Sequence, residues 1–138
     1  ILIEDNMDDA ALALIALGQY NLTNKILHLK NGDEALRFFY GNEAFSGVTF
    51  TMQPKAVFLD LKMPKVDGME VLERLKTEES TKAIPVVILT SSAEDPDIKR
   101  CYELGANSYI VKPIVFENFS KTIAQLGFYW AVLNHEPV

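Results

Sequence analysis

Four short apolar segments of this 138-residue chain each run directly into polar residues. They are Ile1–Ile3 before Glu4 and Asp5, Ala56–Leu59 before Asp60, Val86–Leu89 before Thr90, and Tyr109–Val111 before Lys112. Such runs, separated by stretches with helical spacing, are typical of buried parallel strands. Because ligands bind beyond the carboxyl ends of parallel strands, we expect these polar side chains to share one crevice.

The intervening stretches predict helices, so that a strand and a helix alternate five times along the chain. In the first helix, Leu12, Ile15 and Ala16 are expected on the buried face. In the fourth helix, Pro96 is expected at the first position, with Asp95 as the cap. With right-handed crossovers, this order gives an α/β fold with a doubly wound parallel sheet and helices on both faces. Strands are expected at 1–3, 25–29, 55–61, 85–89 and 108–111, and helices at 8–19, 34–40, 69–77, 96–104 and 116–133.

Length and charge limit the classes of protein to which this chain can belong. At 138 residues and 15.5 kDa, it is expected to form one domain over residues 1–138. No apolar run approaches the roughly 20 residues that span a bilayer, and no signal-peptide pattern opens the chain. With Cys101 as its single cysteine, the chain is expected to be cytoplasmic. Its net charge of −6 and its dispersed basic residues argue against binding to nucleic acid.

Three carboxylates, those of Glu4, Asp5 and Asp60, are expected to meet at the edge of this sheet. Close negative charges are unfavourable unless protons or a cation neutralise them. Hard oxygen ligands without a nearby histidine or cysteine favour Mg²⁺ or Mn²⁺ over zinc. A simpler alternative is that Glu4 and Asp5 only cap the helix that follows them.

Asp60 has the position of a nucleophile, because it follows four apolar residues and so lies at the mouth of the core. A carboxylate can attack a phosphoryl group, as it does in aspartyl-phosphate enzymes. Lys112 would then pair with the phosphoryl oxygens, and Thr90 would donate its hydroxyl to them. The alternative for Asp60 and Lys112 is a buried salt bridge that joins two strands.

Four stretches of the chain match, in order and at the right separations, the motifs of one known family. They are residues 3–6 (IEDN), 59–68 (LDLKMPKVDG), 87–91 (VILTS) and 105–113 (GANSYIVKP). On these motifs, the chain resembles the receiver domain of two-component response regulators over essentially its whole length. The resemblance implies a flavodoxin-like sheet with its five strands in the order 2-1-3-4-5.

The resemblance assigns a phosphorylation site and a metal site to the acidic residues. Asp60 matches the phospho-acceptor, and Asp5 and Asp60 match side-chain ligands of Mg²⁺. The backbone carbonyl of Lys62 matches the third protein ligand, and Glu4 matches a residue that acts on the metal through water. Lys62 and Ser92 also match two positions that tune how long the phosphoryl group survives.

The resemblance also implies a switch at the ends of the last two strands. Thr90 and Tyr109 match the pair in which the hydroxyl moves toward the phosphoryl group and the ring turns inward. Lys112 matches the phosphate-binding lysine, and the Lys112–Pro113 peptide bond matches one that is cis in this family. The surface expected to change comprises the helix at 96–104, the strand at 108–111 and the last helix.

A sensor histidine kinase, which would donate the phosphoryl group from a phosphohistidine, is the partner that the family implies. The chain would catalyse only its own phosphorylation and dephosphorylation, so it is expected to be a signalling receiver and not an enzyme. Its loop at 41–55, residues 102–107 and residues 128–130 resemble single-domain regulators paired with phytochrome histidine kinases. A phytochrome is therefore one candidate partner.

The last helix carries more aromatic side chains than an inward stripe needs. The stripe comprises Phe119, Ile123, Leu126 and Trp130, whereas Phe116, Phe128, Tyr129 and Val132 lie partly off it. An excess of aromatic side chains on one surface usually marks a protein interface. We therefore expect a homodimer through this helix. The alternative is that some of these residues pack under the C-terminal tail.

Three other interpretations share parts of this pattern. A phosphatase of the haloacid dehalogenase type also uses a strand-end aspartate, but it has a second aspartate two residues later, where this chain has Lys62. A flavodoxin-like electron carrier shares the fold, but no Thr/Ser-rich phosphate loop follows the first strand. A degenerate receiver that only binds partners is the third. Against it stands the retention of Glu4, Asp5, Asp60, Thr90 and Lys112.

Overall fold

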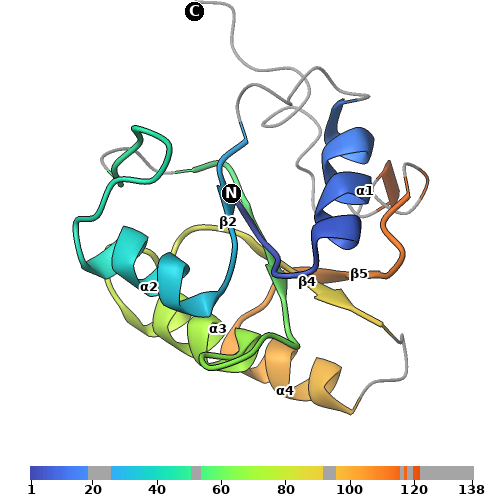
Figure 1. Cartoon of the computed structure of the whole chain (residues 1–138). Coiled ribbons are helices and arrows are strands. Elements are labelled where there is room, and N and C mark those ends of the chain that lie inside the picture. Colours follow the sequence, from blue (N-terminus) through green and yellow to red (C-terminus); the bar gives the residue numbers. More distant parts are fainter. Residues whose placement is uncertain (19–25, 51–53, 92–95, 116, 118–119, 122–138) are drawn as a thin grey trace, which may run out of the picture.

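A five-stranded parallel sheet organises the chain, as the computed structural model shows (Figure 1). The structure describes residues 1–138 except 19–25, 51–53, 92–95, 116, 118–119 and 122–138. The strands are β1 (Leu2–Ile3), β2 (His28–Leu29), β3 (Val57–Asp60), β4 (Val86–Thr90) and β5 (Ser108–Val111). The helices are α1 (Met7–Gly18), α2 (Gly32–Tyr40), α3 (Gly68–Thr77) and α4 (Asp97–Leu104). The order β2-β1-β3-β4-β5 confirms the predicted fold class and strand order.

Helices cover both faces of the sheet: α1 lies on one face, and α2, α3 and α4 lie on the other (Figure 1). Successive side chains of a strand point to opposite faces, so β3 contributes to two cores. Val57 and Leu59 pack in the core under α2, α3 and α4, while Phe58 packs with Leu2 and the buried residues of α1. Both cores therefore hold the strand that ends in Asp60.

The buried face predicted for α1 is partly wrong. Leu12 and Ile15 are 37% and 63% exposed. After Asp9 the helix has no polar side chain, so the apolar pattern alone does not define which side faces the sheet. Mostly alanines face the sheet, because their small side chains let the helix backbone approach it closely. The buried residues of α1 are Ala10, Ala13, Ala16 and Leu17.

The start of α4 lies one residue later than predicted. Pro96 immediately precedes the first residue, Asp97, but its backbone already has helical angles (φ −61°, ψ −21°). The difference is therefore a single residue at a boundary where helices are least sharply defined. The predicted cap, Asp95, lies outside the described residues. The helix ends at Gly105 as predicted, where a φ of 109° favours a residue without a side chain.

Of the predicted last helix, the structure describes Glu117, Ser120 and Lys121, and all three are helical. The predicted interface residues lie outside the described residues: Phe116, Phe128, Tyr129 and Val132. The prediction of a homodimer therefore stays a prediction. Within the described part of the chain, no helix combines the length and the apolar character needed to cross a membrane.

Gly68 lets α3 begin directly beside the carboxyl end of β3. Its backbone N–H group donates a hydrogen bond to the carbonyl oxygen of Leu61 (2.9 Å). A Cβ atom at this position would lie 2.6 Å from Leu61 Cα and would overlap the carbonyl group of Asp60. Asp67 caps the helix by accepting a hydrogen bond from the N–H group of Glu70 (3.0 Å). This close approach fixes the segment that carries Asp60.

We expect Gly68→Ala to lower the free energy of unfolding by about 3 kcal/mol, because the backbone must move to relieve the overlap. Gly47→Ala is the matched control, since its φ is 76° but nothing lies within 4 Å of the added Cβ. The Gly47→Ala substitution should lower the free energy of unfolding by about 1–2 kcal/mol, because of the backbone conformation alone. Urea denaturation measures both variants. Equal losses in the two would contradict the packing argument.

Candidate functional site

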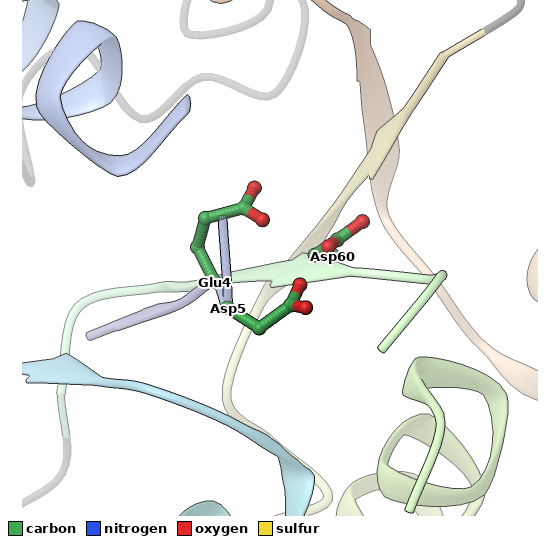
Figure 2. A group of neighbouring side chains, drawn as sticks. All are labelled: Glu4, Asp5 and Asp60. Carbon is green, nitrogen blue, oxygen red and sulfur yellow. The ribbon is translucent and has the colours of Figure 1, made fainter. Parts of the chain in front are cut away.

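Strand pairing brings Glu4, Asp5 and Asp60 together at the carboxyl edge of the sheet. β1 and β3 are neighbours, and Ile3 pairs with Leu59, so the residues that follow lie side by side. One carboxylate oxygen from each of the three acids lies within 4.8 Å of the other two. Figure 2 shows the group, with Glu4 and Asp5 after β1 and Asp60 on β3. We refer to these three residues as the acidic cluster.

Burial makes the acidic cluster electrostatically costly. Glu4 and Asp60 are 0% and 2% exposed, and Asp5 is the most accessible of the three. Burial, followed by the adjacent carboxyl group of Glu4, raises the pKa of Asp60 to about 6, although Lys112 acts in the opposite direction. Burial and the carboxyl group of Asp60 also raise the pKa of Asp5. The cluster therefore favours the binding of protons or of a cation.

Lys112 brings a positive charge to the acidic cluster from the end of β5. Its ammonium nitrogen lies 2.9 Å from Asp9 Oδ2, 3.0 Å from Glu4 Oε1 and 3.2 Å from Asp60 Oδ1. Burial acts to lower the pKa of Lys112, but these acids outweigh it and raise the pKa above its ordinary range. The salt bridge considered as a simpler alternative for Asp60 and Lys112 thus exists as one of three contacts. Negative charge remains in excess.

The alternative in which Glu4 and Asp5 cap the next helix is wrong. Asn6 caps α1, because its Oδ1 accepts hydrogen bonds from the N–H groups of Asp8 (2.9 Å) and Asp9 (3.0 Å). Glu4 instead accepts a hydrogen bond from the N–H group of Asn6 (3.2 Å). The two acids after β1 therefore remain available to the cluster.

The donor atoms of the acidic cluster fit a hard divalent cation. Glu4 Oε1 is buried, and no described group donates a well-aligned hydrogen bond to it, although the Lys112 ammonium lies 3.0 Å away. All the ligand atoms on offer are carboxylate oxygens, which suit Mg²⁺ or Mn²⁺ better than zinc. Glu4, Asp5 and Asp60 are therefore the residues that could hold such an ion.

The predicted switch residues lie on the neighbouring strands β4 and β5, where Thr90 is the last residue of β4 and Tyr109 is the second residue of β5. Thr90 is 2% exposed, and its carbonyl oxygen accepts a hydrogen bond from the backbone N–H group of Lys112 (2.6 Å). Tyr109 is half-buried on β5, with its ring centroid 6.4 Å from that of Tyr102. The Lys112–Pro113 peptide bond is cis, as predicted. Thr90 and Lys112 are thus held together beside the acidic cluster.

Lys62 links the acceptor strand to α4. Its backbone N–H group donates a hydrogen bond to Asp60 Oδ1 (3.2 Å), and its ammonium group pairs with Asp97 Oδ2 (3.0 Å). Asp97 is the first residue of α4. A cavity of about 290 Å³ lies beside this ion pair, lined by Leu61, Lys62, Met63, Asp67, Met69 and Asp97. None of the three acids of the cluster lines this cavity.

Asp9 and His28 join the site, although the sequence interpretation gave them no role in it. His28 Nε2 donates a hydrogen bond to the backbone carbonyl of Glu4 (2.8 Å), and Asp9 pairs with Lys112 (2.9 Å). One signal could have identified Asp9. A helix that follows a strand of such a sheet begins at the carboxyl edge, so its first turn lies near the ligand crevice.

Comparisons with known proteins agree with this arrangement. A family model described as the response regulator receiver domain matches residues 1–124. The probable methanogenesis regulatory protein FilR2 of Methanothrix harundinacea is 39% identical over 137 residues, which cover 99% of this chain and 86% of that protein. The similarity therefore extends over nearly the whole length of both.

Solved structures of regulators are also similar over nearly the whole chain. The bacteriophytochrome response regulator RtBRR aligns with a TM-score of 0.83 and 42% identity, covering 99% of this chain and 81% of that chain. The response regulator Rcp1 of Synechocystis sp. is 30% identical over 94% of this chain and 86% of its own length. The Mn²⁺-bound form of Rcp1 aligns with a TM-score of 0.66 and 28% identity, over 99% of this chain and 95% of that chain.

The raised pKa of Asp60 predicts a pH-dependent affinity for magnesium. Because Mg²⁺ must displace a proton, we expect the affinity to fall about tenfold per pH unit below about 6 and to level off above it. Isothermal titration calorimetry on both sides of this pH measures the affinity. Asp8→Asn, which removes an exposed acid outside the acidic cluster, should keep the same profile. An affinity that does not change with pH would contradict the assignment.

The same pKa gives the sign of a stability effect in the metal-free protein. The pKa of Asp60 is higher in the folded state than its ordinary 3.8, so its contribution to stability is complete below 3.8 and is lost as the pH rises through about 6. We expect the wild type to lose about 1–3 kcal/mol of unfolding free energy across this range, and Asp60→Asn to lose much less. Urea denaturation in the presence of a chelator measures the difference, and identical pH profiles would refute it.

Proposed function

We propose, from the premise that the chain belongs to the response regulator receiver domain family, that it accepts a phosphoryl group on Asp60 in a Mg²⁺-dependent reaction. The observation that carries this proposal is the meeting of Asp60 with Glu4, Asp5 and Lys112 at one edge of the sheet. The family is one of signalling receivers. Membership in this family therefore argues against two alternative functions, a phosphatase of the haloacid dehalogenase type and a flavodoxin-like electron carrier. We further propose that residues 1–138 form a single such domain.

The proposed metal site uses the side chains of Asp5 and Asp60, the backbone carbonyl of Lys62, and Glu4 through water. Support comes from the short distances within the acidic cluster and from the buried Glu4 oxygen without a well-aligned donor. The Mn²⁺-bound form of Rcp1 shows that one relative takes a divalent cation. When bound, such an ion would supply positive charge beside the acceptor carboxylate, where negative charge is in excess.

The proposed reaction moves a phosphoryl group from a phosphohistidine of a sensor kinase to Asp60. A carboxylate oxygen of Asp60 attacks the phosphorus, the bond between phosphorus and the histidine nitrogen breaks, and an acyl phosphate forms. Lys112 pairs with the phosphoryl oxygens, and the hydroxyl of Thr90 donates a hydrogen bond to them. Lys112 lies 3.2 Å from Asp60 and is held to Thr90 through the backbone, which supports these roles. The same residues would also assist the hydrolysis of the acyl phosphate, in which water takes the phosphoryl group.

The proposed switch changes the surface formed by α4, β5 and the last helix, through Thr90 and Tyr109. Lys112 follows β5 directly, and Asp97 at the start of α4 pairs with Lys62 beside the acceptor. A change of charge on Asp60 therefore acts on groups that are attached to both elements. The same surface would serve partner binding or the homodimer, in which we place Phe116, Phe128, Tyr129 and Val132.

The proposed phosphoryl donor is a sensor histidine kinase, and a phytochrome is one candidate. RtBRR, a bacteriophytochrome response regulator by its name, is 42% identical to this chain over almost its whole length. We place the protein itself in the cytoplasm. Its net charge of −6 argues against nucleic acid as a direct partner.

Incubation with Mg²⁺ and acetyl phosphate is expected to add a single phosphoryl group to the wild type and none to Asp60→Asn, because Asp60 is the acceptor. Intact mass spectrometry measures the addition. A chelator should abolish it, and the control Asp8→Asn should be phosphorylated like the wild type. Addition to both the wild type and Asp60→Asn would assign the acceptor elsewhere. No addition to the wild type would favour a receiver that only binds partners.

Sizing with light scattering on the same samples tests the homodimer. We expect a dimer in the phosphorylated wild type, and less dimer in Phe128→Ala, because an aromatic side chain buried in an interface contributes strongly to affinity. Val48→Ala, at a 46% exposed apolar residue in the 41–55 loop, is the control. A monomer at micromolar concentration in every sample would refute the proposed interface.

A further inference from the structure

Asp9 holds the ammonium group of Lys112 toward the first turn of α1. We propose that this contact makes Asp9 a positioning residue, which sets how strongly the site takes up a phosphoryl group by competing with that group for Lys112. The inference rests on the proposed function, because it concerns the same acceptor site.

The contact with Asp9 is the shortest that Lys112 makes with the surrounding acids. It measures 2.9 Å, against 3.0 Å to Glu4 and 3.2 Å to Asp60. The side chains of Asp9 and Lys112 are 23% and 16% exposed, so water screens their attraction less than that of a surface ion pair. In this arrangement, a lysine from the end of β5 is tied to a helix and not only to the acceptor.

The start of α1 does not account for this contact. Asn6 already caps the helix by accepting hydrogen bonds from the N–H groups of Asp8 and Asp9. Asp8 carries the same charge in the same turn, but it is exposed and forms no ion pair with any residue that the structure describes. Either acid would suit the helix dipole, yet only the Asp9 carboxylate reaches Lys112.

A phosphoryl group on Asp60 needs the ammonium group that Asp9 holds. In the resting site, Asp9 draws Lys112 toward α1 and adds a negative charge near the incoming group. Asp9→Asn removes both effects, because an amide carries no charge and attracts an ammonium group less strongly. We therefore expect this variant to bind a phosphoryl mimic about three- to tenfold more tightly than the wild type.

Asp9→Asn should have the opposite effect on the affinity for divalent cations. Without the Asp9 charge, Lys112 is left with Glu4 and Asp60, whose oxygens belong to the acidic cluster. The ammonium group then competes more strongly with a cation for these oxygens. We expect Mg²⁺ to bind Asp9→Asn about three- to tenfold more weakly. Damage to the fold would weaken the binding of both the phosphoryl mimic and Mg²⁺. Opposite changes in the two affinities therefore distinguish a positioning role from a structural one.

The experiment measures two dissociation constants for the wild type, Asp9→Asn and Asp8→Asn. Isothermal titration calorimetry gives the constant for Mg²⁺, and fluorine NMR gives that for beryllofluoride, a phosphoryl mimic, at saturating Mg²⁺. Asp8→Asn removes an equal charge from the same turn and should stay within about twofold of the wild type, since its charge is exposed and screened. In a Lys112→Ala background, Asp9→Asn should change the binding of beryllofluoride much less than it does with Lys112 present, because only the direct repulsion by the Asp9 charge then remains.

Weaker Mg²⁺ binding together with tighter beryllofluoride binding in Asp9→Asn, and neither in Asp8→Asn, would support the inference. Equal constants in the two variants would overturn it, as would weaker binding of both reagents by Asp9→Asn. An effect of Asp9→Asn on beryllofluoride binding that is equally large without Lys112 would also overturn it. A wild type that binds neither reagent would overturn the proposed function itself, so the two failures are distinguishable.

Discussion

The site depends on a single ammonium group placed among an excess of carboxylates. Lys112 lies within 3.2 Å of Glu4, Asp9 and Asp60, and Asp5 completes the acidic cluster. Glu4 and Asp60 are almost fully buried, and removing such charges from water costs more free energy than imperfect ion pairs restore. One cation cannot neutralise four acids. Burial, together with this shortage of positive charge, raises the pKa of Asp60, and the same shortage makes the cluster fit a divalent cation.

The order of the strands determines where that positive charge comes from. The acids of the cluster lie at the carboxyl ends of β1 and β3 in the middle of the sheet, whereas Lys112 follows β5, which β4 separates from β3. A long side chain is therefore needed to reach Asp60. Of the groups that contact Asp60, Lys112 is also bound to Asp9 on α1, and Lys62 is also bound to Asp97 on α4. A change of charge at the acceptor therefore alters the balance of contacts on two helices at once.

Much of the fold and of the acidic cluster could be predicted from sequence, for a physical reason. Strands buried on both faces consist of uninterrupted apolar runs, so the first polar residue after each run marks the edge of the sheet. Asp60, Thr90 and Lys112 could be placed in this way. The rotation of α1 could not, because hydrophobicity favours the burial of Leu12 and Ile15 over that of the alanines, which are the residues that pack on the sheet. Close approach of the helix favours small side chains, and that preference depends on distances that only the structure supplies.

The incorrect face of α1 and the unrecognised role of Asp9 have one cause. Residues spaced by three or four lie on the same side of a helix. Asp8 therefore shares a side with Leu12 and Ile15, whereas Asp9 shares a side with Ala13 and Ala16. The predicted rotation would have turned Asp8 toward the sheet, but the observed burial of the alanines turns Asp9 toward it and leaves Asp8 in solvent. The same packing that places small side chains against the sheet thus selects which of two adjacent acids meets Lys112.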